Sequence, residues 1–235
     1  DLAQVETALK SFEANKALLP AFTKDSDDPQ RTTEALVVVE KQIVTEWRAS
    51  KSGTALIGSN FLEGRIRSAE GNLQKQINRV EGLSEGQRDA IIVGLTGKSR
   101  FVGVQGSAGT GKTYMLSYLN KYAEQHGLRV EGLAPSNRAV EEMRETLPNS
   151  ETVQARLLRG KAKGTSDIAP EKTVVVVDEA SMLTNDQALK LMRQARDGKI
   201  GRVIFLGDTQ QLDGVGAGTP FDLLQKSGMR TAVMD

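Results

Sequence analysis

Apolar residues in the second half of the chain form short continuous runs, separated by longer stretches with helical spacing. The runs are residues 101–105, 128–134, 173–177, 202–206 and 231–234. Between the first two, KTYMLSYLNKYAEQHG is amphipathic and ends at a glycine, which favours a helix with a glycine cap. Strands that are apolar throughout are typical of a parallel sheet with helices on both faces. The pattern therefore predicts an α/β fold.

The first half of the chain shows a different pattern, in which helical periodicity predominates. The apolar positions of residues 1–19 fall on one helical stripe, and FTKDSDDPQR then forms a polar connection that contains a proline. Residues 52–72 are rich in glycine and serine, so we expect them to be partly loop. We expect residues 1–82 to form a small, mainly helical, winged-helix-like accessory region and residues 83–235 to form the α/β domain.

Residues 33–47 contain three consecutive valines, which could form a strand or part of a helix. Leu36, Ile43 and Trp47 keep helical spacing, and Thr33 is available as an N-cap. The spacing favours a helix.

Composition refines this picture mainly by exclusion. The chain has no cysteine, which excludes disulfides, thiolate zinc sites and cysteine nucleophiles. His126 is the single histidine, which excludes a catalytic triad and a histidine-based metal site. The net charge of +1 does not decide for or against nucleic acid, because a basic groove can form on a neutral protein. No apolar stretch is long enough to cross a membrane and no signal pattern begins the chain, so we expect a cytoplasmic protein.

The sequence GSAGTGKT, which begins directly after the apolar run 101–105, matches the pattern G-x-x-x-x-G-K-[ST]. In such a P-loop, backbone N–H groups and a helix N-terminus surround phosphate, while Lys112 would reach the β- and γ-phosphates. The hydroxyl of Thr113 would bind Mg²⁺. The four fixed positions arise by chance in about one chain in a hundred of this length. The candidate nucleotide-binding residues are Gly106, Ser107, Ala108, Gly109, Thr110, Gly111, Lys112 and Thr113.

The sequence VVVVDEAS, at residues 174–181, sends an apolar run directly into two carboxylates. Asp178 can lie opposite the P-loop and hold Mg²⁺ through water, and Glu179 is then the candidate base that orients the attacking water. A buried strand that ends in a solvated acidic pair is the alternative. With a P-loop about 65 residues upstream, the two motifs together predict a nucleoside triphosphatase that uses ATP and Mg²⁺.

Four further stretches narrow the kind of triphosphatase. They are LSEGQRDAI, GLAPSNRAVEEM, ETVQARLL and FLGDTQQLDGVGAG. Together with the P-loop and VVVVDEAS, they resemble in order the Q motif and motifs I, Ia, Ib, II and III of superfamily-1 helicases. The similarity is strongest to the RecD-like branch, and within it to the helicase half of TraI/TrwC-type conjugative relaxases. Residues 83–224 resemble the first motor domain of these proteins, which implies a RecA-like parallel sheet.

The resemblance also implies roles for three side chains near the nucleotide. Gln87 occupies the position of the glutamine that contacts adenine, which an amide can do as both donor and acceptor. Gln211 matches the motif III glutamine that senses the γ-phosphate, and Asp208 would support it. Gln210 has the same chemistry and is the alternative assignment.

Another set of residues matches the single-stranded DNA contacts of the family. The set consists of Pro135, Ser136, Asn137, Arg138 and Thr152. A hydroxyl, an amide, a guanidinium and helix N-terminal N–H groups suit a DNA phosphate, although Ser136 could also be a plain N-cap. The His-Arg pair that often follows the motif Ib threonine is absent, since Gln154 and Ala155 stand there. Phosphate contacts do not separate DNA from RNA. We expect the sparse aromatic residues Phe61, Tyr114 and Trp47 to be core or cover residues.

The resemblance implies the first motor domain of an ATP-dependent 5′→3′ DNA helicase that translocates on single-stranded DNA, from a conjugative relaxase. Its partners would include the second RecA-like domain of the same parent chain, which supplies an arginine to the ATP site, and conjugation-machinery proteins. Alone, the chain is expected to lack efficient unwinding. One alternative is an ATP-regulated single-stranded DNA-binding module without motor activity. Another is a different P-loop ATPase such as an AAA+-type switch, which does not need GDTQQL or APSNRAV.

Overall fold

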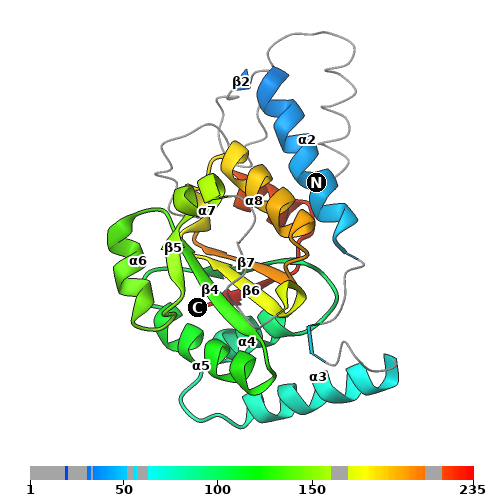
Figure 1. Cartoon of the computed structure of the whole chain (residues 1–235), viewed down its shortest axis with the longest axis vertical. Coiled ribbons are helices and arrows are strands. Elements are labelled where there is room, and N and C mark those ends of the chain that lie inside the picture. Colours follow the sequence, from blue (N-terminus) through cyan, green and yellow to red (C-terminus); the bar gives the residue numbers. More distant parts are fainter. Residues whose placement is uncertain are drawn as a thin grey trace.

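A six-stranded parallel sheet with helices on both faces lies at the centre of the molecule, as the computed structural model of the chain shows (Figure 1). The α/β, RecA-like prediction is confirmed. None of the described helices is both long and apolar enough to span a membrane. The structure describes residues 19–20, 31–32, 34–51, 56–57, 63–159, 169–209 and 219–235.

The strands of the sheet are all parallel to their neighbours. In their order across the sheet they are β5 (Ser150–Thr152), β4 (Arg129–Ala134), β6 (Thr173–Val177), β7 (Arg202–Gly207), β3 (Phe101–Gly106) and β8 (Thr231–Met234). Five of the six coincide within a residue or two with the apolar runs of the sequence. The short strand β5 was not predicted, because its sequence SET has no apolar residue. A separate two-stranded antiparallel ladder joins β1 (Leu19–Pro20) to β2 (Arg31–Thr32).

Strand β6 explains why four valines occur in a row. Val174 and Val176 belong to the apolar cluster on one face of the sheet, whereas Val175 and Val177 belong to the cluster on the other face. Every residue of β6 is buried. A strand that is covered on both faces needs apolar side chains at successive positions, so the run does not alternate.

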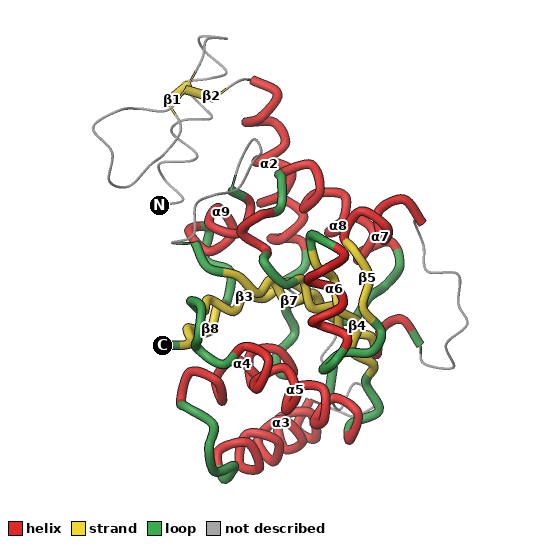
Figure 2. The backbone as a smooth tube through the Cα atoms, turned by 90° about the vertical axis from the view of Figure 1, so that its left-hand side faces the viewer, coloured by secondary structure: helices red, strands yellow, loops and turns green. Residues whose placement is uncertain are grey.

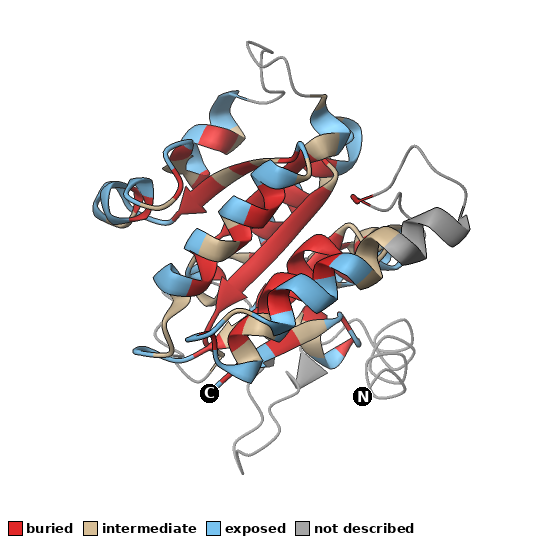
Figure 3. Ribbon diagram, turned by 90° about the horizontal axis from the view of Figure 1, so that it is seen from below, coloured by how far each residue is buried: buried red, intermediate tan, exposed pale blue. Residues whose placement is uncertain are grey.

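The helices form two layers, one on each face of the sheet (Figure 2). Their buried sides face the strands and their exposed sides face solvent (Figure 3). The layer that packs on the first cluster contains α3 (Glu63–Asn78), α4 (Glu85–Leu95), α5 (Lys112–Gln125) and α6 (Asn137–Arg144). The layer that packs on the second contains α2 (Glu34–Ala49), α7 (Val153–Arg159), α8 (Asn185–Asp197) and α9 (Pro220–Lys226). Two 3-10 turns, η1 (Pro170–Lys172) and η2 (Ala180–Met182), flank β6.

Helix α2 packs against α8 and α9 and completes the second cluster. Trp47 is 1% exposed there, which confirms it as a core residue. Glu46 pairs with Arg196 at 2.6 Å, and Glu40 accepts a hydrogen bond from Asn185 at 3.2 Å. The helical interpretation of this segment is confirmed, although its expected cap, Thr33, lies outside the described residues. The division of the chain at residues 82 and 83 stays a prediction.

Two other expectations for the first half have different outcomes. The helix expected over residues 1–19 falls almost entirely outside the described residues. The segment 52–72, expected to be partly loop, overlaps α3 from Glu63 onward, and Leu73 and Ile77 of this helix are fully buried in the first cluster. The glycine at position 71 is not required by space, because nothing lies within 4 Å of the Cβ that another residue would place there.

Candidate nucleotide-binding site

The motifs found in the sequence meet at one edge of the sheet. The P-loop follows β3, the segment 135–138 follows β4, Thr152 ends β5, Asp178 follows β6, and Asp208 follows β7. Because the strands are parallel, all five lie at the carboxyl edge, where ligands of open α/β sheets bind. One strand, β7, separates the P-loop strand from the strand of Asp178.

The P-loop takes a backbone form that its glycines make accessible. Gly109 and Gly111 have φ angles of 84° and 76°, in the left-handed region that other residues adopt only with strain. The hydroxyl of Thr110 donates to the carbonyl of Ser107 at 2.9 Å and closes the turn between them. A Cβ at position 111 would lie 2.5 Å from Nε2 of Gln87, so a larger residue would displace this amide in addition to straining φ.

Lys112 begins α5 and folds back over the loop. Its Nζ donates to the carbonyl of Gly106, 3.1 Å away, so the ammonium lies within the turn of the P-loop. Thr113 follows in the first turn of α5 and is exposed, as are Ser107 and Ala108. The loop therefore offers backbone N–H groups, a helix N-terminus and a cation to one phosphate-sized position.

Gln87 lies directly behind the P-loop. Its side chain is part of a capping box at the start of α4, where Oε1 accepts from the N–H of Ser84 at 3.0 Å. Its Nε2 donates to the carbonyl of Thr110 at 3.0 Å. One N–H and one lone pair of the amide remain for another partner. The adenine contact stays a prediction, and the structure adds a second duty, which is support of the loop.

Asp178 and Glu179 follow β6 in a conformation that their neighbours enforce. The backbone N–H of Asp178 donates to the carbonyl of Leu133 at 2.8 Å, which extends the pairing with β4. Glu179 has φ 49° and ψ 42°, a left-handed conformation that is costly for a non-glycine residue. Its N–H donates to Oδ1 of Asp178 at 2.9 Å. This strained turn exposes the Glu179 side chain beside the buried strand.

The two carboxyls and the P-loop lysine interact electrostatically. Burial raises the pKa of Asp178 above its usual range, against the opposing effects of the Glu179 N–H and of Lys112. Burial also raises the pKa of Glu179, with further increases from the charges of Asp178 and Glu142, while Lys112 lowers it. Lys112 is therefore close enough to both carboxyls to form one charge system with them.

This charge system fits a Mg²⁺ ion that is shared with phosphate. Mg²⁺ is usually held by one or two protein carboxylates together with phosphates and water, so a dedicated cluster of ligands is not needed. No group of three or more acidic or histidine ligands occurs among the residues that the structure describes. Asp178, whose carboxylate is desolvated without a metal, and the exposed hydroxyl of Thr113 are the residues that would hold the ion.

We expect Asp178→Asn to raise the free energy of unfolding at pH 7 by about 0.5–2 kcal/mol, the gain that single stabilising substitutions commonly give. Asn keeps the acceptor for the Glu179 N–H but carries no desolvated charge. A carboxyl whose pKa is raised by folding binds protons more tightly in the folded state, so the wild-type protein regains stability as pH falls through that pKa. Urea denaturation at pH 7 and at a lower pH should therefore show a gain that shrinks as the Asp178 carboxyl becomes protonated.

The control for this variant is Asp186→Asn, at an exposed carboxylate that pairs with Lys190 at 2.6 Å. It should give no gain at either pH, because such surface pairs contribute at most a few tenths of a kcal/mol. A loss of stability in Asp178→Asn at pH 7 would contradict the burial argument.

The end of β7 contacts Gln105 of β3, a residue that the sequence analysis missed. Asp208 is 4% exposed, and its Oδ1 accepts a hydrogen bond of 2.8 Å from Nε2 of Gln105, the last residue of β3 before the P-loop. A glutamine inside an apolar run gives no distinctive signal, because its role depends on the neighbouring strand. Gln211 and its alternative, Gln210, lie outside the described residues.

The predicted DNA contacts lie beside the nucleotide site, at the ends of β4 and β5. All four residues from Pro135 to Arg138 are exposed. The hydroxyl of Ser136 accepts from the N–H of Ala139 at 3.2 Å, so the N-cap interpretation holds. Arg138 is paired with Glu142 at 3.2 Å on an open helix surface. The DNA roles themselves stay predictions.

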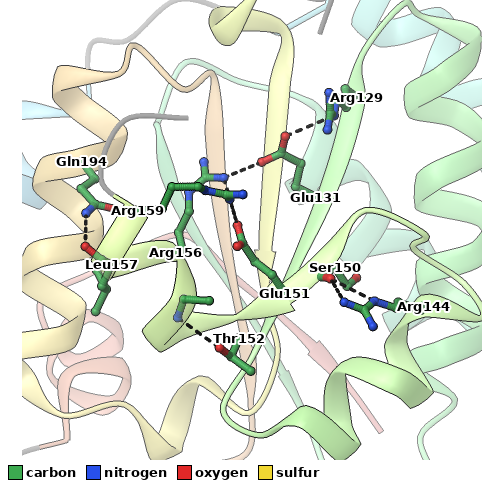
Figure 4. Close-up of polar contacts among 11 residues, drawn as sticks. Arg129, Glu131, Arg144, Ser150, Glu151, Thr152, Arg156, Leu157, Arg159 and Gln194 are labelled. Atoms are coloured by element: carbon green, nitrogen blue, oxygen red, sulfur yellow. Dashed lines mark hydrogen bonds and ion pairs between the residues drawn. The ribbon is translucent and has the colours of Figure 1, made fainter. Parts of the chain in front are cut away.

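Thr152 lies next to a charged network around Arg156 (Figure 4). Arg156 is buried between Glu131 of β4, at 2.9 Å, and Glu151 of β5, at 3.5 Å. Arg159 also pairs with Glu151. The network fixes α7 on the sheet, and the hydroxyl of Thr152 accepts from the N–H of Ala155 at 3.1 Å. Because Thr152 is the register partner of Ala134, its side chain lies next to the segment that follows β4.

Tyr114 is a cover residue and does not belong to the core. It is 43% exposed in the first turn of α5 and stacks edge-on against Tyr118, with ring centroids 5.1 Å apart. Its hydroxyl lies over Gly82, where a Cβ would be 3.2 Å away. Phe61 lies outside the described residues.

Comparison with known proteins places these motifs in a family. The AAA domain family matches residues 82–235. The multifunctional conjugation protein TraI of Escherichia coli K12 is 35% identical over 197 residues, which cover 80% of this chain and 11% of TraI. The ATP-dependent RecD2 DNA helicase of Deinococcus radiodurans is 33% identical over 144 residues, which cover 60% of this chain and 19% of RecD2. The Pif1 helicase of Candida albicans has a TM-score of 0.47 at 21% identity and covers 66% of this chain and 40% of the Pif1 chain.

The family match includes the P-loop, the Asp178–Glu179 pair and Asp208, which the structure brings together at one edge of the sheet. The chain spans only 11% to 19% of the length of TraI and RecD2. The similarity is therefore one of a single domain. The chain belongs to the AAA domain family, and 80% of it is similar to one part of the conjugation protein TraI.

Proposed function

We propose that this chain is the ATP-binding first motor domain of an ATP-dependent DNA helicase that translocates 5′→3′ on single-stranded DNA. The observation that carries the proposal is the adjacency of two sites at one edge of the sheet. The P-loop and Asp178 form the first, and the segment 135–138 with Thr152 forms the second. A motor needs this adjacency, because nucleotide turnover must change the grip on the strand.

The residues of the first site supply the parts that phosphoryl transfer to water requires. Lys112 and the P-loop N–H groups bind and orient the β- and γ-phosphates, and Thr113 and Asp178 hold Mg²⁺, which neutralises phosphate charge. Glu179, exposed beside them, orients water and accepts its proton. Burial raises the pKa of Glu179, so that it lies closer to neutral pH than the pKa of a free glutamate. The Glu179 carboxylate is therefore a stronger base.

The residues of the second site suit a sugar-phosphate backbone. Ser136, Asn137 and Arg138 present a hydroxyl, an amide and a guanidinium at the start of α6, next to the hydroxyl of Thr152. Contacts of this kind carry little sequence information and weaken with salt. We infer binding that tolerates any base sequence and declines steeply with ionic strength.

In this proposal the ATP site is completed from outside the chain. An arginine from a second RecA-like domain of the same parent would neutralise charge in the transition state, an effect worth about 10³–10⁵ in turnover in other P-loop proteins. The TraI relative supports a conjugative relaxase as the parent, with conjugation-machinery proteins as partners and the cytoplasm as the location. Alone, the chain would bind both ligands with slow turnover and no efficient unwinding.

The test is the fluorescence anisotropy of a labelled oligo-dT titrated with the chain, with and without a non-hydrolysable ATP analogue and Mg²⁺. We expect the DNA affinity to change with nucleotide, because the two sites share one sheet edge. A parallel titration with an oligo-U of the same length separates DNA from RNA. Nucleotide binding without any DNA binding would contradict the proposal and would favour another kind of P-loop ATPase.

A further inference from the structure

Gln105 makes three hydrogen bonds at the junction between the P-loop strand and the end of β7. Its Nε2 donates to Oδ1 of Asp208 at 2.8 Å. Its Oε1 accepts from the backbone N–H of Thr209 at 3.3 Å and from Nε2 of Gln225 at 3.1 Å. The carboxylate of Asp208 can only accept and the N–H of Thr209 can only donate, so these partners set the orientation of the Gln105 amide.

The three bonds join segments that are far apart in the sequence. Gln105 is followed at once by Gly106, whose carbonyl accepts from the P-loop Lys112. Asp208 and Thr209 belong to the stretch that resembles motif III, and Gln225 belongs to α9, which begins after that stretch. Gln105 therefore lies directly before the phosphate loop in the chain, and its amide contacts described residues of motif III and the helix that follows it.

The chemistry of this contact suits the transmission of small displacements. A partly buried hydrogen bond to an ionised carboxylate is among the stronger polar contacts, and it is sensitive to shifts of a few tenths of an ångström. A movement of the P-loop backbone on phosphate binding would displace the neighbouring Gln105. The amide can pass that movement to Asp208 and Thr209, whereas an apolar side chain of similar size could not.

We propose that Gln105 is a positioning residue that couples occupancy of the P-loop to the segment following β7, and through it to the grip on single-stranded DNA. The inference rests on the proposed function, because it assumes that nucleotide and DNA bind to the same domain. It goes beyond that proposal because it assigns the coupling to the side chain of Gln105. In this role Gln105 contacts neither the nucleotide nor the DNA.

The experiment measures the nucleotide-dependent shift in oligo-dT affinity for the wild-type chain and for Gln105→Leu. Allosteric couplings are commonly about 5–150-fold. We expect the shift of the variant to fall below about 2-fold, while its affinity for each ligand alone stays within about 3-fold of wild type. Gln194→Leu is the matched control, since Gln194 also donates its amide to a partly buried acceptor, the Leu157 carbonyl at 3.2 Å, and joins α8 to α7.

A reciprocal exchange separates coupling from simple loss of packing. Gln105→Glu alone places two carboxylates against each other and should abolish the shift. Gln105→Glu combined with Asp208→Asn reverses the donor and the acceptor, because the Asn amide can donate to the Glu carboxylate, which still accepts from Thr209 and Gln225. The double variant should regain at least part of the shift that Gln105→Glu loses.

The outcomes distinguish this inference from the proposed function. A wild-type chain that binds nucleotide but not DNA would overturn both. A wild-type shift that persists in Gln105→Leu, or a double variant no better than Gln105→Glu, would overturn the role of Gln105 alone. Thermal unfolding of each variant checks that the fold is retained. If Gln105→Leu is unstable, the comparison of Gln105→Glu with the double variant decides whether Gln105 couples the two sites.

Discussion

Lys112→Ala is expected to weaken nucleoside triphosphate binding by about 10- to 100-fold, in line with the loss of about 1.5–3 kcal/mol from a hydrogen bond to a charged group. The ammonium lies within the turn of the P-loop, 3.1 Å from the Gly106 carbonyl, where a γ-phosphate can replace that carbonyl as its partner. Any turnover should fall further, by about 10²–10³, because charge develops on the phosphate oxygens during transfer. A fluorescent ATP analogue in the presence of Mg²⁺ provides the binding measurement.

The same substitution should disturb the acidic pair across the site. Lys112 lowers the pKa of both Asp178 and Glu179, so its removal should increase the upward shift of both pKa values. As the pH is lowered, the two carboxyls of the variant should therefore become protonated at a higher pH than those of the wild type. We expect the residual nucleotide binding of the variant to weaken at that higher pH. Lys121→Ala is the control, since this lysine lies on the same helix against the ring of Tyr118, 5.6 Å from its centroid, and should bind nucleotide normally. Equal affinity of Lys112→Ala and wild type would refute the assignment of the phosphate site.

Arg202→Leu is expected to lower the free energy of unfolding by about 3–5 kcal/mol, because it leaves several buried carbonyls without a donor, at a cost of about 1–3 kcal/mol for each. The guanidinium is fully buried and donates to the carbonyls of Val93 at 2.9 Å, Thr96 at 2.6 Å and Gly97 at 2.6 Å. Burial lowers the pKa of Arg202 to about 10, so the side chain is still charged at pH 7. Urea denaturation at neutral pH measures the loss.

The reason for so large an effect lies at the end of α4. The last carbonyls of a helix have no partner within it, and α4 has no basic residue in its last turn. Arg202, at the start of β7, takes that place and offsets the negative end of the helix dipole. Arg138→Ala is the matched control, because Arg138 is an exposed arginine whose pair with Glu142 should contribute about 0.3–0.5 kcal/mol. Equal losses in the two variants would contradict the capping role.

The sequence was sufficient where one local pattern determines one structure. The four consecutive valines of β6 favour a strand that is covered on both faces, and residues 173–177 form that strand. The P-loop glycines require left-handed backbone that the structure shows at Gly109 and Gly111. The helical spacing between Leu36 and Trp47 outweighed the β preference of the valines, because one face of α2 is buried against α8.

The rest depends on contacts between distant segments, which one sequence does not reveal. Gln105 and Arg202 look like ordinary polar interruptions of apolar strands until β3 and β7 are placed side by side and α4 is laid over them. The strain at Glu179 is equally hidden, since DEAS has no glycine to signal a left-handed residue. Strand β5 has no apolar signal, and it is recognisable only from its register with β4.

The packing of α2 also bears on how the domain can be isolated. The family match begins at residue 82, but Ile43, Val44 and Trp47 fill the cluster beneath α8 and α9. A chain trimmed to start at residue 82 would leave the apolar surface that these three side chains cover facing water, and large exposed apolar patches promote aggregation. The smallest soluble unit suited to expression or crystallisation therefore includes α2, well upstream of the boundary that motif matching alone would select.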